Sequence, residues 1–332
     1  MATQEIKKQS PKVYIDRPDH LSGGHRLCAG CGAPVILRQV LMGAGDSPVV
    51  VSNATGCVEV STTIYPYTAW KDSYIHSAFE NAAATISGVE AALISLKKQG
   101  KVTEDFKLLS VAGDGGSYDI GLQAISGALE RYHDIVILCY DNGAYMNTGF
   151  QRSAATPKGA WTTTSPVGKV RPGKNQQRKN LTEIAIAHNI PYVAQASPHN
   201  FRDLIYKAEK AFAAEGPAFL NVLSPCPRGW RSKESDSIQL AEAMVKSNYW
   251  PLFEVENGVY KINYDPKKRK GAVADWMKQQ GRFRHLFTPE NEWIVEETQE
   301  MTDYQWERLK AMEEATARFA PQEAAEAQEP AE

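Results

Sequence analysis

Short runs of apolar residues alternate along the chain with longer segments in which apolar residues recur every three or four positions. The short runs are typical of buried strands, and the longer segments are typical of helices that pack on a sheet. A regular strand–helix alternation predicts parallel strands joined by right-handed crossovers. We therefore expect an α/β fold, a mostly parallel sheet with helices on both faces. The predicted strands are residues 48–52, 106–112, 135–140, 192–194 and 218–223, and the predicted helices begin near 34, 79, 117, 181 and 201.

The pattern changes after about residue 236. Residues 252–262 predict a hairpin that turns at Asn257-Gly258, and charged helical segments continue to about Phe319. The end of the chain contains only Ala, Glu, Gln and Pro, a composition that favours disorder. We therefore divide the chain into an α/β domain at 1–235, a small C-terminal hairpin and helical extension at 236–319, and a disordered tail at 320–332.

The composition excludes some classes of partner. A formal net charge of -2 gives no electrostatic reason to expect nucleic acid or an anionic membrane. The N-terminal residues contain no apolar core of a signal peptide, and no stretch approaches the roughly 18 apolar residues of a membrane span. Five cysteines in 332 residues, an odd number, argue against a secreted disulfide framework. We expect a cytoplasmic protein.

Four of the cysteines lie in loop-like sequence beside glycine or proline: Cys28, Cys31, Cys57 and Cys226. Cys28 and Cys31 form a CxxC pair whose neighbouring glycines let backbone amides approach a bound cluster, and Cys226 precedes a proline, as in ferredoxin cluster motifs. An iron–sulfur cluster fits this set of thiols.

Three other interpretations of these cysteines remain open. Structural zinc uses the same ligands, although it normally takes two CxxC pairs. A thioredoxin-like redox pair would need the CxxC motif alone, and the cysteines could also be buried structural residues. Cys139 differs from the four because it lies inside the apolar run 135–140, which predicts a core position.

A second motif combines Gly113-Asp114-Gly115 with Asn142, which follows Gly115 by 27 positions. Both segments follow predicted neighbouring parallel strands, whose carboxyl ends form ligand sites in such sheets. A carboxylate, an amide oxygen and the backbone carbonyl of Ala144 are hard ligands that suit magnesium and a diphosphate. An ordinary turn at Gly113–Gly115 is the alternative.

Residues 169–179 form a basic segment with lysine or arginine at positions 169, 171, 174, 178 and 179. One interpretation is a solvated loop, since charge runs usually face water. The other is a surface for the phosphates of a ligand or for the acidic face of a partner.

The combined motifs resemble one family. They are Gly24-His-Arg-Leu-Cys-Ala-Gly-Cys-Gly32, Ala54-Thr-Gly-Cys57, Phe79-Glu-Asn-Ala-Ala-Ala84, Gly113-Asp-Gly115, Tyr145-Met-Asn-Thr-Gly149 and Ser224-Pro-Cys-Pro-Arg-Gly-Trp230. The sequence from about residue 12 to 287 is similar to the beta subunit of pyruvate:ferredoxin oxidoreductase. This resemblance implies a thiamine diphosphate-binding fold with one 4Fe-4S cluster beside the cofactor.

The resemblance also implies roles for individual residues. Cys28, Cys31, Cys57 and Cys226 would ligate the cluster, and Asp114, Asn142 and Ala144 would bind Mg2+. Asn147 would lie near the reacting ring of the cofactor. The implied contacts with thiamine diphosphate are Ala33, Cys57, Gly113, Asp114, Gly115, Gly116, Asn142, Gly143, Ala144, Tyr145, Met146 and Asn147.

The activity implied is the coenzyme A-dependent oxidation of a 2-oxoacid, most simply pyruvate, to an acyl-CoA and CO2, with electrons passed to ferredoxin. Expected partners are an alpha subunit that supplies the glutamate activating thiamine, and gamma and delta (ferredoxin-like) subunits. Glu59 and Glu80 are the candidates for that glutamate within this chain. Alternatives are relatives acting on oxalate, phenylglyoxylate, 2-oxoglutarate or branched-chain 2-oxoacids, a non-redox thiamine decarboxylase with structural zinc, and an electron-transfer module.

Overall fold

The computed structural model describes residues 6, 9–267 and 271–321. Its described residues form an eight-stranded sheet in the order β2-β1-β3-β4-β6-β5-β7-β8. The first six strands in this order pair in parallel, and β7 and β8 pair antiparallel. The strands are β1 (Val49–Ala54), β2 (Ser73–Ser77), β3 (Lys107–Gly113), β4 (Val136–Asp141), β5 (Tyr192–Ala196), β6 (Ala218–Leu223), β7 (Phe253–Glu256) and β8 (Val259–Ile262).

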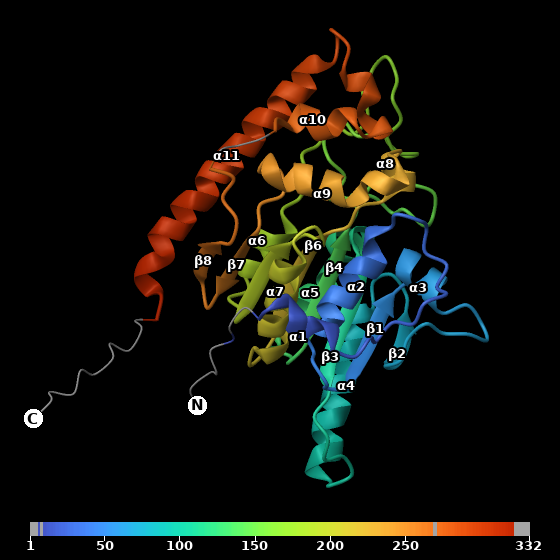
Figure 1. Ribbon diagram of the computed structural model, residues 1–332, viewed down its shortest axis with the longest axis vertical. Coiled ribbons are helices and arrows are strands. Elements are labelled where there is room, and N and C mark those ends of the chain that lie inside the picture. The colour runs from blue at the N-terminus through green and yellow to red at the C-terminus, as the bar shows by residue number, and fades with distance from the viewer. Residues whose placement is uncertain (1–5, 7–8, 268–270, 322–332) are drawn as a thin grey trace, which may run out of the picture.

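Helices cover both faces of the sheet, which confirms the predicted α/β fold (Figure 1). Apolar residues of α2 and α7 pack into the core on one face, whereas those of α4, α5 and α6 pack on the other. The helices are α1 (Pro11–Ile15), α2 (Gly32–Met42), α3 (Cys57–Thr62), α4 (Ala82–Lys98), α5 (Leu122–Glu130), α6 (Leu181–Ile186), α7 (Phe201–Ala213), α8 (Pro227–Trp230), α9 (Ser237–Lys246), α10 (Val273–Lys278) and α11 (Glu292–Thr316).

A third apolar core lies beyond the carboxyl ends of the strands. It joins Leu223 at the end of β6 and Ala144 after β4 to α9, α10 and the short helix η3 (Gly281–Leu286). Figure 1 shows α8, α9 and α10 stacked above these strand ends, with α11 descending beside β7 and β8. The C-terminal third of the chain therefore covers the edge of the sheet where ligands are expected to bind.

Several elements differ from the sequence-based expectation. β2 was not expected, because its residues are mostly exposed at the edge of the sheet and carry no clear apolar pattern. The expected hairpin at 252–262 is confirmed, and β7 bonds to β5, so it continues the main sheet. The expected disordered tail falls mostly at 322–332, outside the described residues.

Among the described residues, no helix has both the length and the apolar composition that crossing a membrane requires.

Candidate cofactor site at the carboxyl ends of the strands

The register of β3 and β4 brings the two segments of the predicted magnesium motif together. Gly113 pairs with Tyr140 across the two parallel strands, so Asp114 and Asp141 follow at the same level. After Asp114 the chain enters a short π-helix, η1 (Gly115–Ile120). A cavity opens at this edge between the ends of β1, β3 and β4 and the loop that follows β4.

Ten of the predicted cofactor residues line this cavity: Cys57, Gly113, Asp114, Gly115, Gly116, Asn142, Ala144, Tyr145, Met146 and Asn147. The cavity also includes Thr55, Gly56, Phe79, Tyr140 and Thr148, which the residue chemistry alone did not single out. Thr55, Gly56, Phe79 and Thr148 lie within the quoted motifs, so they could have been found from the sequence.

Two predicted contacts do not line the cavity. Ala33 is the second residue of α2 and is buried in the apolar core. Gly143 lies behind the cavity with φ +78, and a Cβ there would lie 3.1 Å from the guanidinium of Arg282. Its role is therefore to shape the loop: its amide donates to Asp141 and its carbonyl accepts from Thr156.

The side chains of Asp114 and Asn142 and the backbone carbonyl of Ala144 converge beside the cavity. The side-chain amide of Asn142 lies 2.9 Å from Asp114 Oδ1 and 2.8 Å from the carbonyl oxygen of Ala144, and its NH2 group donates to both when it faces them. With the amide turned the other way, the three groups would offer a bound cation three oxygen ligands of the kind that magnesium takes. The donor set therefore fits magnesium.

The carboxyl of Asp114 is buried. Burial, followed by the nearby charge of Asp141, raises the pKa of Asp114 to about 8. The Ser153 hydroxyl donates to Asp114 Oδ2, and the backbone N–H of Asn142 donates to Asp114 Oδ1 at 3.3 Å. Both hydrogen bonds lower the pKa of Asp114. A cation at this carboxylate would stabilise its ionised form.

A buried layer of side chains supports the loop that carries Asn142. The Trp230 indole donates to the carbonyl oxygen of Asn142 at 2.7 Å, and Arg282 lies 3.5 Å from the same oxygen. Behind it, Arg178 donates to Asp141 Oδ2 at 2.5 Å and to the Tyr118 hydroxyl at 2.7 Å. Neither Trp230 nor Arg282 stood out in the sequence as a supporting residue of this site.

The basic segment 169–179 contains two kinds of cation, and Lys169 and Arg171 are exposed, as the solvated-loop interpretation predicts. Lys174 is buried and donates to the carbonyls of Ala154 and Thr156, and Lys179 donates to the carbonyl of Tyr118. With Arg178 paired to Asp141, these three cations hold the fold together. The solvated-loop interpretation is therefore wrong for them, and they do not form a free surface for phosphates.

The CxxC loop lies against the loop that carries Cys226. The Gly32 amide donates to the carbonyl of Pro225 at 2.9 Å, and the Gly229 amide donates to Cys226 Sγ at 3.4 Å. Gly30 has φ +71, and a Cβ there would lie 2.3 Å from the carbonyl oxygen of Glu234.

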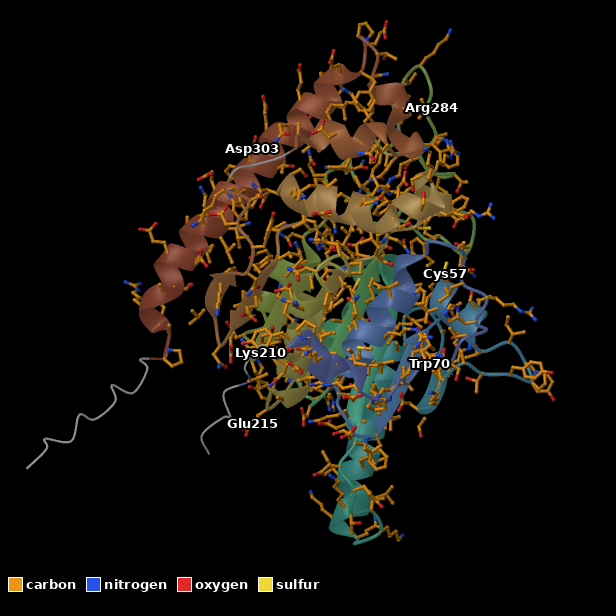
Figure 2. The ribbon with its side chains drawn as sticks, viewed as in Figure 1. Cys57, Trp70, Lys210, Glu215, Arg284 and Asp303 are labelled. Carbon is orange, nitrogen blue, oxygen red and sulfur yellow. The ribbon has the colours of Figure 1, made fainter. Side chains whose placement is uncertain are left out.

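Burial is the main cause that raises the pKa of the Cys57 thiol to about 12, and the charges of Cys226, Cys31 and Cys28 add to it. All four thiols are free, and each of the other three lies near enough to affect Cys57. Figure 2 shows Cys57, the first residue of α3, on the side of the molecule away from α11. Within the described ranges, no three His, Cys, Asp or Glu side chains are close enough to hold one metal ion. A four-iron cluster needs its sulfurs farther apart than a single ion does, and four free thiols fit its ligand chemistry. Cys139 is fully buried in β4, as expected.

Neither candidate glutamate lines the cavity. Glu59 lies 3.7 Å from His76 and faces an open groove with Asp72 and Tyr74. Asp114 is thus the acidic residue of the cavity lining in the described part of the chain.

Comparison with known proteins agrees with this geometry. Residues 54–222 match the family model of the thiamine pyrophosphate enzyme, C-terminal TPP binding domain. A solved 2-oxoglutarate:ferredoxin oxidoreductase from Magnetococcus marinus shares the fold, with a TM-score of 0.53 and 21% identity over 73% of this chain and 83% of that one. The chain therefore contains the TPP binding domain of a thiamine pyrophosphate enzyme, and the solved structure has the same fold.

Curated relatives define its place within the class. Pyruvate synthase subunit PorB of Thermotoga maritima is 50% identical over 93% of this chain and 97% of its own length. PorB of Methanocaldococcus jannaschii is 48% identical over 82% of this chain and 92% of its own length. Ketoisovalerate oxidoreductase subunit VorB of Pyrococcus furiosus is 43% identical over 94% of this chain and 98% of its own length. The chain belongs to this family: it is the thiamine diphosphate-binding beta subunit of a 2-oxoacid:ferredoxin oxidoreductase.

Proposed function

We propose that this subunit serves an enzyme that converts pyruvate and coenzyme A to acetyl-CoA and CO2 and reduces ferredoxin. The several relatives named as pyruvate synthase subunits support pyruvate as the substrate. The VorB relative supports a branched-chain 2-oxoacid as the second candidate. Rates with pyruvate and with 2-ketoisovalerate, measured on the assembled complex, distinguish the two substrates.

The proposed magnesium ligands are Asp114, Asn142 and the carbonyl of Ala144. The convergence of these three groups is the observation that carries this assignment, because the side-chain amide of Asn142 lies 2.9 Å from Asp114 Oδ1 and 2.8 Å from the carbonyl oxygen of Ala144. Gly115 lets the Tyr145 ring approach the wall of the proposed diphosphate site closely, since a Cβ at Gly115 would lie 2.2 Å from that ring. The Tyr145 hydroxyl donates to the Gly115 carbonyl at 2.9 Å and holds this wall in place.

Cys28, Cys31, Cys57 and Cys226 are the proposed ligands of a 4Fe-4S cluster. Cys57 also lines the cavity, so the cluster would lie directly beside the cofactor. When bound, thiamine diphosphate supplies the electron sink for cleavage of the carbon–carbon bond of the 2-oxoacid. Asn147 lines the open part of the cavity, where it can orient the substrate.

Partner subunits complete the proposal. Because neither candidate glutamate lines the cavity, the group that activates thiamine comes from an alpha subunit. Ferredoxin-like gamma and delta subunits would carry electrons onward to ferredoxin.

The experiment that tests the cofactor site is Asp114→Asn, with thiamine diphosphate binding measured by calorimetry at several magnesium concentrations. Asparagine keeps the size of the side chain and can still accept from Ser153, but it lacks the charge that magnesium needs. We expect affinity to fall by more than about 100-fold, beyond the usual cost of removing a partner of a ligand. The thermal unfolding temperature of the cofactor-free variant should not be lower than that of the unchanged chain, because the substitution removes a buried negative charge.

Asp105→Asn is the matched control, since Asp105 is exposed and far from the cavity lining. It should bind magnesium and thiamine diphosphate like the unchanged chain. Unchanged affinity in Asp114→Asn would contradict the proposed site.

A further inference from the structure

Arg282 is a buried cation without a carboxylate partner. Its side chain is 3% exposed, and no carboxylate in the described part of the chain forms an ion pair with it. A buried charge that no opposite charge compensates is unfavourable, and in native proteins such groups concentrate at functional sites. The contacts of Arg282 show which group its charge can act on.

Three contacts fix the position of the guanidinium. Its Nε donates to Gln280 Oε1 at 2.8 Å, and its Nη1 donates to the carbonyl oxygen of Asn142 at 3.5 Å. It also lies over the ring of Trp230, 4.8 Å from the ring centre. The Trp230 indole donates to the same Asn142 oxygen, so ring and cation meet at one carbonyl.

The same contacts place Arg282 beside the turn that begins at Cys226. This turn is the short helix α8, in which the backbone N–H of Trp230 donates to the Cys226 carbonyl at 2.8 Å. Gly281, the neighbour of Arg282, donates to the carbonyl of Arg231 at the other end of α8, at 3.1 Å. Burial raises the pKa of the Cys226 thiol, whereas the charge of Arg282 is among the causes that lower it. Arg282 is therefore close enough to act on Cys226 through its charge.

The carboxylates near Arg282 serve other groups. Asp141 forms its ion pair with Arg178, and Asp114 is proposed above as a magnesium ligand. Burial lowers the pKa of Arg282 to about 10, which leaves the guanidinium charged at neutral pH. Cys226 binds iron as a thiolate, so the proposed cluster supplies the negative charge that Arg282 otherwise lacks.

A fixed positive charge beside an iron–sulfur cluster favours its reduced form, because reduction adds one negative charge. We propose that the buried charge of Arg282 raises the reduction potential of the cluster at Cys226. Arg282 does not line the cofactor cavity, so it acts as a positioning residue for charge and not as a ligand. The proposal rests on the proposed function, in which the electron comes from the 2-oxoacid and passes on to ferredoxin.

The test is the reduction potential of the cluster in Arg282→Gln. The full chain is reconstituted anaerobically with iron and sulfide and titrated with reductant, and the reduced cluster is followed by EPR. Glutamine can still donate to the Asn142 carbonyl but carries no charge. We expect the potential to fall by at least about 59 mV, which is a tenfold change in the equilibrium constant of a one-electron couple. Iron per chain should stay unchanged, because no ligand is removed.

The controls separate charge from shape. Arg282→Lys keeps the charge, so its potential should lie closer to that of the unchanged chain than to that of Arg282→Gln. Arg284→Gln removes the same charge from an exposed position of the same short helix, η3, and should not move the potential. Figure 2 shows Arg284 well away from Cys57, another of the proposed ligands.

A further variant, Arg282→Met, keeps the test decisive if glutamine prevents folding. An apolar chain suits a buried position, since apolar replacements of buried charges are often neutral for stability. This variant should lower the potential as Arg282→Gln does.

Three results obtained with an intact cluster would overturn the proposal. They are an unchanged potential in the folded Arg282→Gln or Arg282→Met variant, an equal decrease in Arg282→Lys, and an equal decrease in Arg284→Gln. Failure of the proposed function looks different, because the unchanged chain would then assemble no iron–sulfur cluster in the same reconstitution. That result would overturn the proposed ligands and this inference together.

Discussion

At the scale of single residues, Cys57 connects the cofactor cavity with the group of loop cysteines. It begins α3, it lines the cofactor cavity, and its thiol lies near the other three loop cysteines. Cys139 has the same side chain but lies in the middle of β4, without exposure. Substitutions at these two residues therefore distinguish the loss of a proposed cluster ligand from the loss of a buried packing contact.

We expect Cys57→Ser to lower iron from about four atoms per chain to a small fraction of that value, because a serine oxygen is a poor replacement for a thiolate on iron. Cys226→Ser should do the same. Iron and acid-labile sulfide, measured after anaerobic purification, decide the matter.

Cys139→Ser is the control and should retain its iron, at some cost in stability from a buried hydroxyl. Equal loss of iron in all three variants would count against the assigned ligands.

Lys174 is the buried cation of the basic segment. Burial, with the charges of Arg152 and Arg178, lowers the pKa of Lys174 to about 7. An unfolded lysine has a pKa of about 10.4, so between these two values the unfolded chain binds more protons than the native chain. The free energy of unfolding should therefore rise with pH across this window through Lys174 and be independent of this group below it.

Lys174→Met should remove this contribution, which has a slope of up to about 1.4 kcal/mol per pH unit. Urea unfolding of the variant and of the unchanged chain, compared from pH 6.5 to 9.5 at about 0.5-unit steps, measures the difference. Lys169→Met, at an exposed position in the same segment, should leave the slope unchanged. An identical slope in Lys174→Met would show that the buried lysine stays charged.

At the scale of secondary-structure elements, the central part of the sheet could be predicted well from the sequence. Strand β6 has the bounds that its apolar run predicts, because both of its faces are buried. Strand β2 could not be predicted, since an edge strand with mostly exposed residues lacks that pattern.

The site motifs were predictable for a different reason: their residue types and their position after strands are local features. The resemblance also pointed to Ala33 and Gly143, yet Ala33 is buried in the apolar core as part of α2 and Gly143 packs against Arg282, and a local motif does not show such packing. The inward direction of Lys174, Arg178 and Lys179 depends on Asp141 and on distant carbonyls, which a charge count along the chain does not show.

The CxxC loop depends on a close approach to η2 (Glu234–Asp236). We expect Gly30→Ala to lower iron content, because its Cβ would collide with the Glu234 carbonyl at 2.3 Å and displace the loop. Positive-φ strain of about 1–3 kcal/mol adds to this effect.

Gly24→Ala is the matched control, since Gly24 also has positive φ (+83) but a Cβ there has no neighbour within 4 Å. Iron per chain, compared between the two variants, separates the collision from the backbone strain. Equal iron in both would mean that the contact with Glu234 does not position the cysteines.

At the scale of the whole molecule, the cofactor cavity is incomplete as a catalytic site. Asp114 is the acidic residue of its described lining, and it is proposed above as a magnesium ligand. The group that activates thiamine must therefore come from another subunit if the proposed function holds.

We expect the isolated chain to bind thiamine diphosphate and magnesium but to oxidise no pyruvate. The measurement is the exchange of the C2 proton of the bound cofactor, followed by NMR in deuterated water. This exchange should be slow in the chain alone. With the alpha subunit it should be faster by at least about 100-fold, which is the usual size of the rate increase from general acid–base catalysis. Fast exchange in the isolated chain would locate the activating group here.

The pairing of Gly113 with Tyr140 has a further consequence, which concerns folding kinetics. The proposed magnesium ligands meet only when β3 and β4 are joined in their final register, and a slip of one strand by one residue would reverse the direction of each of its side chains. The cofactor therefore cannot bind a chain in which these strands are unpaired, and it gives little help to the early steps of folding. A ligand of this kind slows unfolding far more than it speeds folding, so the loaded subunit persists because it rarely opens.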